Sequence, residues 1–356
     1  MPEAAQQHVA ILVDEGPEIV MSELAVLKCR SVFVPIDPTW PDARIAYILR
    51  DSSARVALVL RAACRVIRNK LVCVDGDDME VSHLRSHIIY TSGTTGEPKG
   101  VVCEHRGLLA YMQSKALAHE IDSNSRVLLA AAITWDPSLG DIFSTLAQAA
   151  LLCIAPRASL TTSLLDVLVQ GRVTHVCTTP ALWGLLDGSV SAADLPHLRV
   201  LALGGAALTA SIVAKWSRAL RLINTYGVTE ATVYQTWHVC DGREEDEFKV
   251  VGRPFKDVLV KVEGDEGEGG AVEGEILVGG VQVACGYLRR DELTRSKFFE
   301  DDQQVRWFRT GDVGRWRRRG GGGKNSDLEL EVLGRIDFQV KLRGFRIELQ
   351  EIESVI

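Results

Sequence analysis

Short, continuous apolar runs alternate with helix-period segments from the N-terminus to Val233, and this alternation constrains the fold more than any other feature of the sequence. The runs are built from Val, Ile, Leu and Ala without regular polar alternation, which is typical of parallel strands covered on both faces. The predicted strands are 8–14, 31–36, 55–60, 70–75, 86–92, 126–132, 151–156, 174–179, 198–204 and 221–227. Amphipathic stretches predict helices between them, at 17–27, 41–50, 106–119 and 211–220. This order predicts βαβ units and an α/β fold.

After Val233 the pattern changes to short strands separated by glycine-rich turns, at 258–264, 273–280 and 328–334. Such spacing predicts an antiparallel, barrel-like region. Two segments of biased composition, 263–275 and 315–327, are expected to be hairpin tips, with an acidic partner for the arginines of the second as the alternative. The sequence therefore predicts an α/β core over 1–235 and a β-barrel-like subdomain over 236–336.

Composition excludes several classes of function. The net charge of −7 argues against a nucleic-acid partner. Eight scattered cysteines without a Cys-x-x-Cys pair favour reduced thiols in a cytoplasmic setting over disulfides or zinc. The N-terminus has no basic region of a signal peptide, and the best apolar stretch, 146–155, is too short to span a bilayer. No membrane partner is expected.

The stretch YTSGTTGEPKG at 90–100 concentrates hydroxyls, glycines and one lysine in eleven residues. Glycines let backbone N–H groups turn toward an anion, hydroxyls donate to phosphate oxygens, and a lysine adds a point charge. The composition suits a polyphosphate. The spacing is not that of a P-loop, and neither that pattern nor G-x-G-x-x-G occurs in the chain. This is therefore a phosphate loop of another kind.

Two more polar clusters follow apolar strands. In NTYGVTEATVY at 224–234, a tyrosine can stack on a base, and a Thr–Glu pair can bind phosphate and a magnesium ion. In FRTGDVGRW at 308–316, Asp312 follows a tight glycine turn, where an aspartate can take ribose hydroxyls. Taken singly, the first cluster can be a strand cap and the second a plain turn.

Together and in this order, the motifs resemble the adenylate-forming superfamily, which comprises acyl- and aryl-CoA synthetases, luciferases and the adenylation domains of nonribosomal peptide synthetases. The similarity runs from about His8 to the last residue. It is strongest toward the peptide-synthetase branch, through 26–52, 134–143, 274–288 and 335–353. It implies the large N-terminal domain of that fold, with two parallel-sheet α/β subdomains, the first incomplete, and a distorted β-barrel. Residues 337–356 would begin a truncated C-terminal domain, without the lysine that the family places there.

The resemblance implies that a carboxylate attacks the α-phosphorus of ATP and that pyrophosphate leaves. Lys99, Thr229 and Glu230 would be the catalytic residues, with Glu230 on Mg²⁺ and Asp337 as the hinge. A carrier-protein phosphopantetheine or CoA would accept the acyl group. The implied ATP-binding residues are Thr91, Ser92, Gly93, Thr94, Thr95, Gly96 and Lys99 on the phosphate loop, Gly204, Gly205, Ala206, Asn224, Tyr226 and Gly227 near the adenine, Thr229 at the α-phosphate, and Asp312 and Arg335 at the ribose.

The same resemblance places Asp136 where amino-acid-activating members pair an aspartate with the substrate's amino group. The alternative is local, because Asp136 or Ser138 can cap a helix over 139–149. The implied pocket residues are Trp135, Asp136, Pro137, Gly140, Cys177, Ala202, Gly204, Thr225, Val233 and Tyr234. Most are small and uncharged, which favours a neutral amino acid. Trp135 can gate the pocket or simply pack in the core.

Three functions remain open from the sequence: amino-acid adenylation, carboxylate–CoA ligation, and nucleotide binding without catalysis. The family's proline in the second cluster is replaced by Val228. The chain is also expected to lack the family's first motif. From these departures we expect this chain to bind Mg·ATP weakly and to turn over far more slowly than a complete relative.

Overall fold

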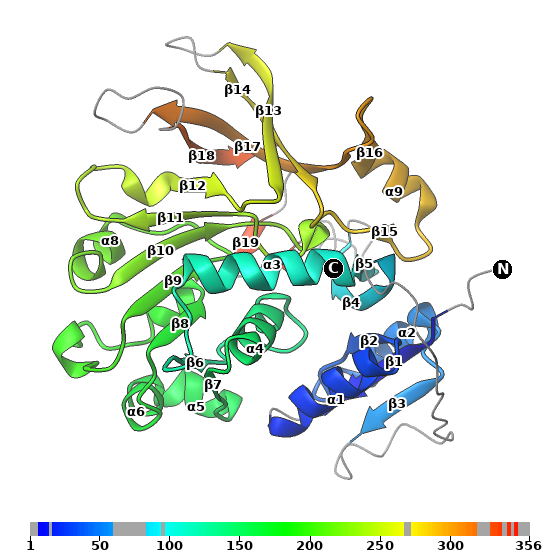
Figure 1. The fold of residues 1–356 in the computed structure, drawn as a ribbon, viewed down its shortest axis with the longest axis horizontal. Coiled ribbons are helices and arrows are strands. Elements are labelled where there is room, and N and C mark those ends of the chain that lie inside the picture. Colours follow the sequence, from blue (N-terminus) through cyan, green and yellow to red (C-terminus); the bar gives the residue numbers. More distant parts are fainter. Residues whose placement is uncertain are drawn as a thin grey trace.

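Two large sheets carry the fold of the computed structural model, which describes residues 6–13, 16–59, 83–93, 97–266, 272–318, 328–336, 340–342 and 345–347. The six-stranded sheet has the order β15 (Gly286–Tyr287), β5 (Lys99–Glu104), β4 (Arg85–Thr91), β2 (Val32–Pro35), β1 (His8–Leu12) and β3 (Val56–Val59). In Figure 1 this sheet lies beside the larger one, and α3 crosses the middle of the molecule between them.

The twelve-stranded sheet begins with antiparallel strands and ends with parallel ones. Its order is β13 (Val258–Glu266), β14 (Val272–Gly280), β17 (Arg306–Arg318), β18 (Leu328–Arg335), β12 (Val250–Pro254), β11 (Thr236–Cys240), β10 (Arg221–Tyr226), β9 (Val200–Gly204), β8 (His175–Thr178), β6 (Arg126–Leu128) and β7 (Leu151–Cys153), with β16 (Phe298–Glu300) paired to β17. A separate hairpin joins β19 (Val340–Leu342) and β20 (Phe345–Ile347).

Helices pack against the apolar faces of the two large sheets. They are α1 (Pro17–Lys28), α2 (Asp42–Ser52), α3 (His105–Ala118), α4 (Pro137–Ala147), α5 (Arg157–Thr162), α6 (Leu164–Gln170), α7 (Pro180–Trp183), α8 (Ala210–Trp216) and α9 (Asp291–Lys297), with 3₁₀ turns η3 (Ala192–Asp194), η4 (Thr229–Ala231) and η5 (Glu247–Lys249). One apolar core joins the first sheet to α3, α4 and the antiparallel strands, and a second lies between β6–β10 and α5–α8. No helix in the described part of the chain has the length and apolar character needed to cross a membrane.

The predicted α/β class is confirmed. Strands β1, β2 and β3 pair in parallel, and so do β6 to β10. All four predicted helices form. The strand predicted at 70–75 lies outside the described residues. From β11 onward the pairing is antiparallel, as expected, and the described strands extend the sheet as an open array. The division of the chain at residues 235 and 336 stays a prediction.

The core face of α1 contains an acidic residue. Ile19, Glu23 and Val26 are buried together at helical spacing, and no side-chain or backbone donor among the described residues reaches either Glu23 oxygen. Burial without a partner disfavours the charged carboxylate. It raises the pKa of Glu23 from 4.5 to about 8.

This pKa shift predicts that Glu23 lowers the free energy of unfolding in a pH-dependent way, and that Glu23→Gln removes this pH dependence. Below about pH 4.5 folded and unfolded chains both hold the proton, whereas between about pH 4.5 and 8 only the folded chain does. The Glu23 contribution to the free energy of unfolding therefore falls by about 1.4 kcal/mol per pH unit across that window and levels off above it. Urea unfolding of both chains at several pH values measures the difference. A difference that does not grow with pH would contradict the prediction.

Candidate active site

The predicted phosphate loop is the connection of the hairpin β4–β5, in which Thr91 pairs with Lys99. Thr91 and Ser92 are half-buried and Gly93 is buried, while Thr94, Thr95 and Gly96 lie outside the described residues. A Cβ on Gly93 would lie 2.2 Å from the carbonyl oxygen of Glu97, so only glycine fits this close backbone approach. The hairpin explains why sequence reasoning missed β5, because the loop's glycines suggested irregular chain on both sides.

Lys99 and Glu230 meet through a residue that the sequence analysis did not single out. The Tyr287 hydroxyl donates to Glu230 Oε1 at 2.8 Å, and Lys99 Nζ lies 3.4 Å from that hydroxyl and 3.8 Å from the same carboxylate oxygen. The Lys99 ammonium also lies 4.6 Å from the centroid of the Tyr287 ring. All three side chains are buried. The cation expected at the phosphates and the carboxylate expected at the metal are thus neighbours.

The predicted ribose site is a second buried group. Tyr226, at the end of β10, donates its hydroxyl to Asp312 Oδ2 at 2.7 Å, and Arg335 Nη1 donates to Asp312 Oδ1 at 2.5 Å. Asp312 and Arg335 are register partners on β17 and β18. Burial, followed by the nearby Asp312 charge, raises the pKa of Tyr226 well above its ordinary value, so its hydroxyl stays a donor.

The tight turn predicted before Asp312 is wrong. Thr310, Gly311 and Asp312 lie inside the long strand β17, where Gly311 has φ +72°. The register of β17 shifts against β14 and β18 on either side of this point. The glycine therefore permits a bulge, which aims the next side chain inward without ending the strand.

The loop between β10 and β11 carries both Tyr226 and Glu230. Gln235, which is fully buried, closes it: its backbone N–H donates to the Tyr226 carbonyl at 2.9 Å, and its side chain bonds Val228 N–H at 2.9 Å and the Ala231 carbonyl at 2.7 Å. These bonds make one compact unit of the loop.

The remaining members of the second cluster have mixed surroundings. Thr229 is half-buried on η4. A Cβ on Gly227 would meet Tyr234 Cα at 2.1 Å, so this glycine allows the loop to close on itself. The Asn224 side-chain amide donates to the carbonyls of Phe248 and Val250, at 3.3 and 2.7 Å, which ties β10 to the start of β12. Its assignment to the adenine stays a prediction.

Trp135 lies against the end of β9. A Cβ on Gly205, which has φ +75°, would come within 3.0 Å of the Trp135 ring. Gly204 pairs with Thr225 across β9 and β10, and Ala206 follows half-buried. Trp135 therefore lies next to Gly205, one of the residues assigned to the adenine, and its assignment as a gate stays a prediction.

Asp136 is 3% exposed and occupies the residue before the first turn of α4. Its side chain makes no capping hydrogen bond to that turn, and the Ser138 hydroxyl instead donates to the Trp135 carbonyl at 2.8 Å. The local alternative, a helix cap, is therefore not what the Asp136 or Ser138 side chain provides. The role of Asp136 as the partner of a substrate ammonium stays a prediction.

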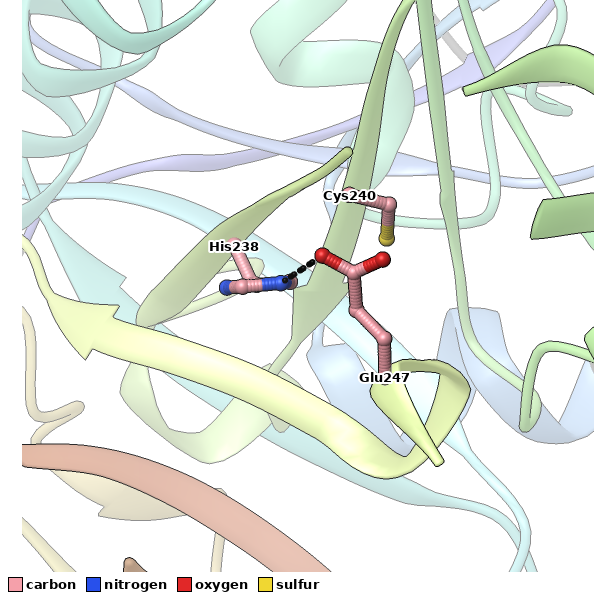
Figure 2. A group of neighbouring side chains, drawn as sticks. All are labelled: His238, Cys240 and Glu247. Atoms are coloured by element: carbon pink, nitrogen blue, oxygen red, sulfur yellow. Dashed lines mark hydrogen bonds and ion pairs between the residues drawn. The ribbon is translucent and has the colours of Figure 1, made fainter. Parts of the chain in front are cut away.

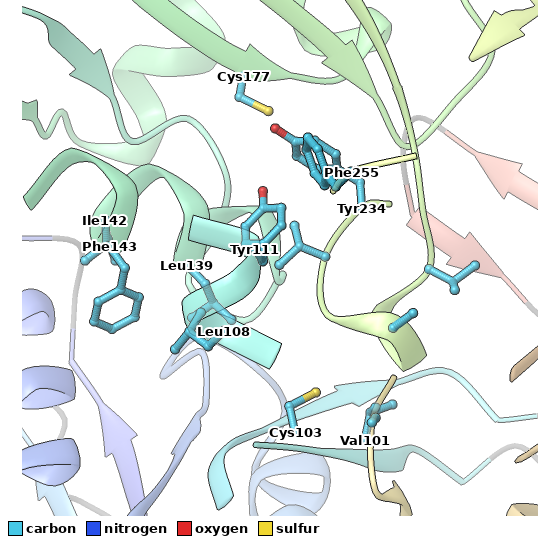
Figure 3. Close-up of a cluster of buried hydrophobic side chains, with 14 of the residues drawn as sticks. Val101, Cys103, Leu108, Tyr111, Leu139, Ile142, Phe143, Cys177, Tyr234 and Phe255 are labelled. Atoms are coloured by element: carbon cyan, nitrogen blue, oxygen red, sulfur yellow. The ribbon is translucent and has the colours of Figure 1, made fainter. Parts of the chain in front are cut away.

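Aromatic rings lie together beside two of the predicted pocket residues, Cys177 and Tyr234 (Figure 3). The Tyr111 and Tyr234 rings meet edge to face at 5.1 Å, beside Phe255, and the Tyr234 hydroxyl contacts His119 Nε2 at 2.7 Å. A Cβ on Gly140 would lie 2.5 Å from the Tyr111 hydroxyl, so glycine at 140 makes room for a ring from α3. Sequence analysis missed Tyr111, which looked like one more core position of a helix.

The other pocket residues come from β8, β9, β10, the start of α4 and the chain before β11. Burial raises the pKa of the Cys177 thiol to about 12, so this side chain is neutral. Cys177 on β8 pairs with Ala202 on β9. Thr225 and Val233 are buried and Pro137 is half-buried. The predicted neutral lining agrees with these surroundings.

A buried ion pair lies behind this lining. Lys115 Nζ on α3 is 2.6 Å from Asp141 Oδ1 on α4, and both residues are fully buried. A Cβ on Gly140 would also lie 2.8 Å from Lys115 Cδ, so the pair begins directly beneath the pocket residue. Because the two charges offset each other, the pair adds no net charge beside the pocket residues.

Comparison with known proteins identifies the family. Residues 4–288 match the model of the AMP-binding enzyme family, and the chain belongs to it. Bacitracin synthase 3 of Bacillus licheniformis is 33% identical over 97% of this chain. Phosphinothricin tripeptide synthetase PhsC of Streptomyces viridochromogenes is 35% identical over 98%. The chain spans only 6% of the first relative and 33% of the second.

Solved structures show the same fold. The adenylation domain AlmE of Vibrio cholerae, in complex with glycyl-adenosine-5'-phosphate, superposes with a TM-score of 0.82 at 24% identity, covering 98% of this chain and 74% of that one. A four-domain nonribosomal peptide synthetase bound to AMP and glycine has a TM-score of 0.77 at 25% identity, covering 98% of this chain and 27% of that chain. Asp337, the predicted hinge, lies outside the described residues.

Proposed function

We propose that this chain binds ATP and activates a carboxylic acid, a neutral amino acid in the leading form of the proposal, as its acyl-adenylate with release of pyrophosphate. The observation that carries it is the loop between β10 and β11. That loop holds Tyr226 against Asp312 and Glu230 against Lys99, so one segment reaches both a ribose-type and a phosphate-type site.

The described residues support a division of labour at the nucleotide. Asp312 offers carboxylate oxygens to ribose hydroxyls, with Tyr226 and Arg335 fixing its position. Lys99 supplies positive charge at the phosphates, where the acid's oxygen bonds to the α-phosphorus and the bond to pyrophosphate breaks. Preorganised positive charge at that point lowers the barrier because negative charge accumulates there. Thr229 is assigned to the α-phosphate.

Mg²⁺ fits the site as a companion of ATP. It prefers oxygen ligands and is commonly held by one or two carboxylates together with phosphates and waters. Glu230, fully buried and fixed by the Tyr287 hydroxyl, is a carboxylate of that kind. When bound, Mg²⁺ would neutralise phosphate charge. Glu230 itself would hold the ion and keep Lys99 nearby.

The acid is assigned to the pocket that begins at Asp136. Its buried carboxylate would pair with a substrate ammonium, and the neutral lining from Gly140 to Tyr234 favours an uncharged side chain. The acyl acceptor would be a thiol, either phosphopantetheine on a carrier protein or CoA. The name of one relative, a tripeptide synthetase, agrees with peptide synthesis. A cytoplasmic location stays a prediction.

Exchange of labelled pyrophosphate into ATP tests the proposal across matched panels of amino acids and plain carboxylic acids. Exchange with amino acids alone is the expected result. Exchange with plain acids as well would favour the CoA-ligase alternative. No exchange, together with ATP binding measured by calorimetry, would favour nucleotide binding without catalysis and would contradict the proposed activity of this chain.

Asp312→Asn is expected to weaken ATP binding by about 10–100-fold. The change removes a charged acceptor from a buried group, and one hydrogen bond to a charged partner typically contributes about 1.5–3 kcal/mol. Calorimetric titration of ATP measures it, with Asp257→Asn as the control because Asp257 is exposed. A folded Asp312→Asn chain with unchanged ATP affinity would remove Asp312 from the ribose site.

A further inference from the structure

Three buried side chains with different donor atoms meet at the end of β11 (Figure 2), on the strand that pairs with β10, where His238 is the register partner of Asn224. His238 and Cys240 point to one face of β11 because they are two residues apart, and Glu247 on η5 reaches the same place. Their ligand atoms all lie within 4.8 Å of one another, and none of the three residues is more than 4% exposed. Sequence spacing did not reveal this group, because it depends on where η5 folds back.

The ring of His238 is oriented from its other side. Its Nδ1 faces Glu329 Oε1 on β18 at 3.2 Å, while its Nε2 faces Glu247 Oε1 at 3.0 Å. A carboxylate on one ring nitrogen fixes the ring and the tautomer, and metal-binding histidines commonly have such a partner. Nε2 is therefore the nitrogen available beside Glu247 and Cys240.

Glu247 is also held in place. Its Oε1 accepts the Asp241 N–H at 2.9 Å, and its Oε2 accepts the Gly242 N–H at 2.7 Å. Two carboxylate oxygens have about four lone-pair positions, so these two bonds and the His238 contact leave one position for a cation. The ligand geometry is thus fixed by backbone and by β18.

We propose that His238 Nε2, Cys240 Sγ and a Glu247 oxygen bind one zinc ion that fastens the turn after β11. Nitrogen, sulfur and carboxylate ligands select zinc-like ions over Mg²⁺ or Ca²⁺. Zinc displaces the proton between His238 and Glu247 and the thiol proton of Cys240, and both leave to solvent. The two charges of Zn²⁺ replace those of the two protons, so the net charge of the buried group does not change. Water or the second Glu247 oxygen completes the tetrahedron.

Cobalt titration of the whole chain tests the site. After removal of metals with a chelator, Co²⁺ should bind at one equivalent, with the visible spectrum of a tetrahedral ion and a thiolate-to-cobalt charge-transfer band. Zinc should displace it and raise the thermal midpoint. Absence of stoichiometric binding to the folded chain would overturn the proposal in favour of a hydrogen-bonded His–Glu group.

Variants locate the ion. Cys240→Ser should abolish the charge-transfer band, whereas Cys153→Ser, the control on β7, should keep it. Glu329→Gln, which changes only the group that orients His238, should weaken cobalt binding by about 10–100-fold. If Cys240→Ser fails to fold, the Glu329→Gln and Cys153→Ser titrations still decide. Survival of the charge-transfer band in Cys240→Ser would contradict the assignment. So would loss of the band in Cys153→Ser, or a cobalt affinity that Glu329→Gln leaves unchanged.

Discussion

Asp136→Ala is expected to lower the affinity for a non-hydrolysable aminoacyl-adenylate analogue by on the order of 10²–10³-fold while sparing ATP binding. Asp136 is buried, and its side chain makes no capping hydrogen bond to the first turn of α4. Removing one partner of a buried charge pair typically costs about 3–5 kcal/mol, because the remaining ammonium is stranded. Calorimetric titration of the analogue and of ATP against both chains measures the two affinities separately.

The controls for Asp136 separate charge from shape. Asp136→Asn keeps the size of the side chain and should lose nearly as much analogue affinity. An analogue that lacks the amino group should bind both chains equally. Unchanged analogue affinity in a folded Asp136→Ala chain would contradict the role of Asp136 as the partner of the substrate ammonium.

Lys115→Met is expected to cost about 3–5 kcal/mol of unfolding free energy. Methionine keeps the unbranched apolar part of the lysine side chain but leaves Asp141 charged and buried without its cation. An unpaired buried charge is strongly destabilising. Desolvation already raises the pKa of Asp141 above its ordinary value despite Lys115. Urea unfolding of the two chains measures the loss.

The matched control for Lys115 is an exposed ion pair. Arg243 lies 3.4 Å from Asp241 with most of its side chain in water, so Arg243→Met should change stability by less than about 1 kcal/mol. The double variant Lys115→Met, Asp141→Asn should recover part of the loss, because it removes the stranded charge. Equal effects of Lys115→Met and Arg243→Met would show that the buried pair is not a stabilising contact.

Sequence reasoning predicted the parallel half of the fold well because its strands are continuous apolar runs that differ in period from the helices. It missed β5, β11, β12 and β17. These strands contain glycine or polar residues, so their strand character comes from pairing with distant partners. Gly311 shows the difficulty clearly: Thr-Gly-Asp has the local pattern of a turn, and only the neighbours of β17 show that it is a bulge.

The candidate site was predicted unevenly for a related reason. Residues within one motif, such as Tyr226 and Glu230, could be named from the sequence through a family resemblance. Tyr287 could not, because its contact with Lys99 joins residues far apart in the chain. Lys115 and Tyr111 lie on the buried face of α3, where a helical pattern gives no sign of a charge pair or of a ring that reaches Gly140.

Gln235 gives the loop between β10 and β11 a property that its individual residues do not have. Since its side chain and backbone bind three other members of that loop, displacement of one end must be transmitted to the other. The site proposed for the ribose, next to Tyr226, and the site proposed for Mg²⁺, at Glu230, are therefore connected through Gln235.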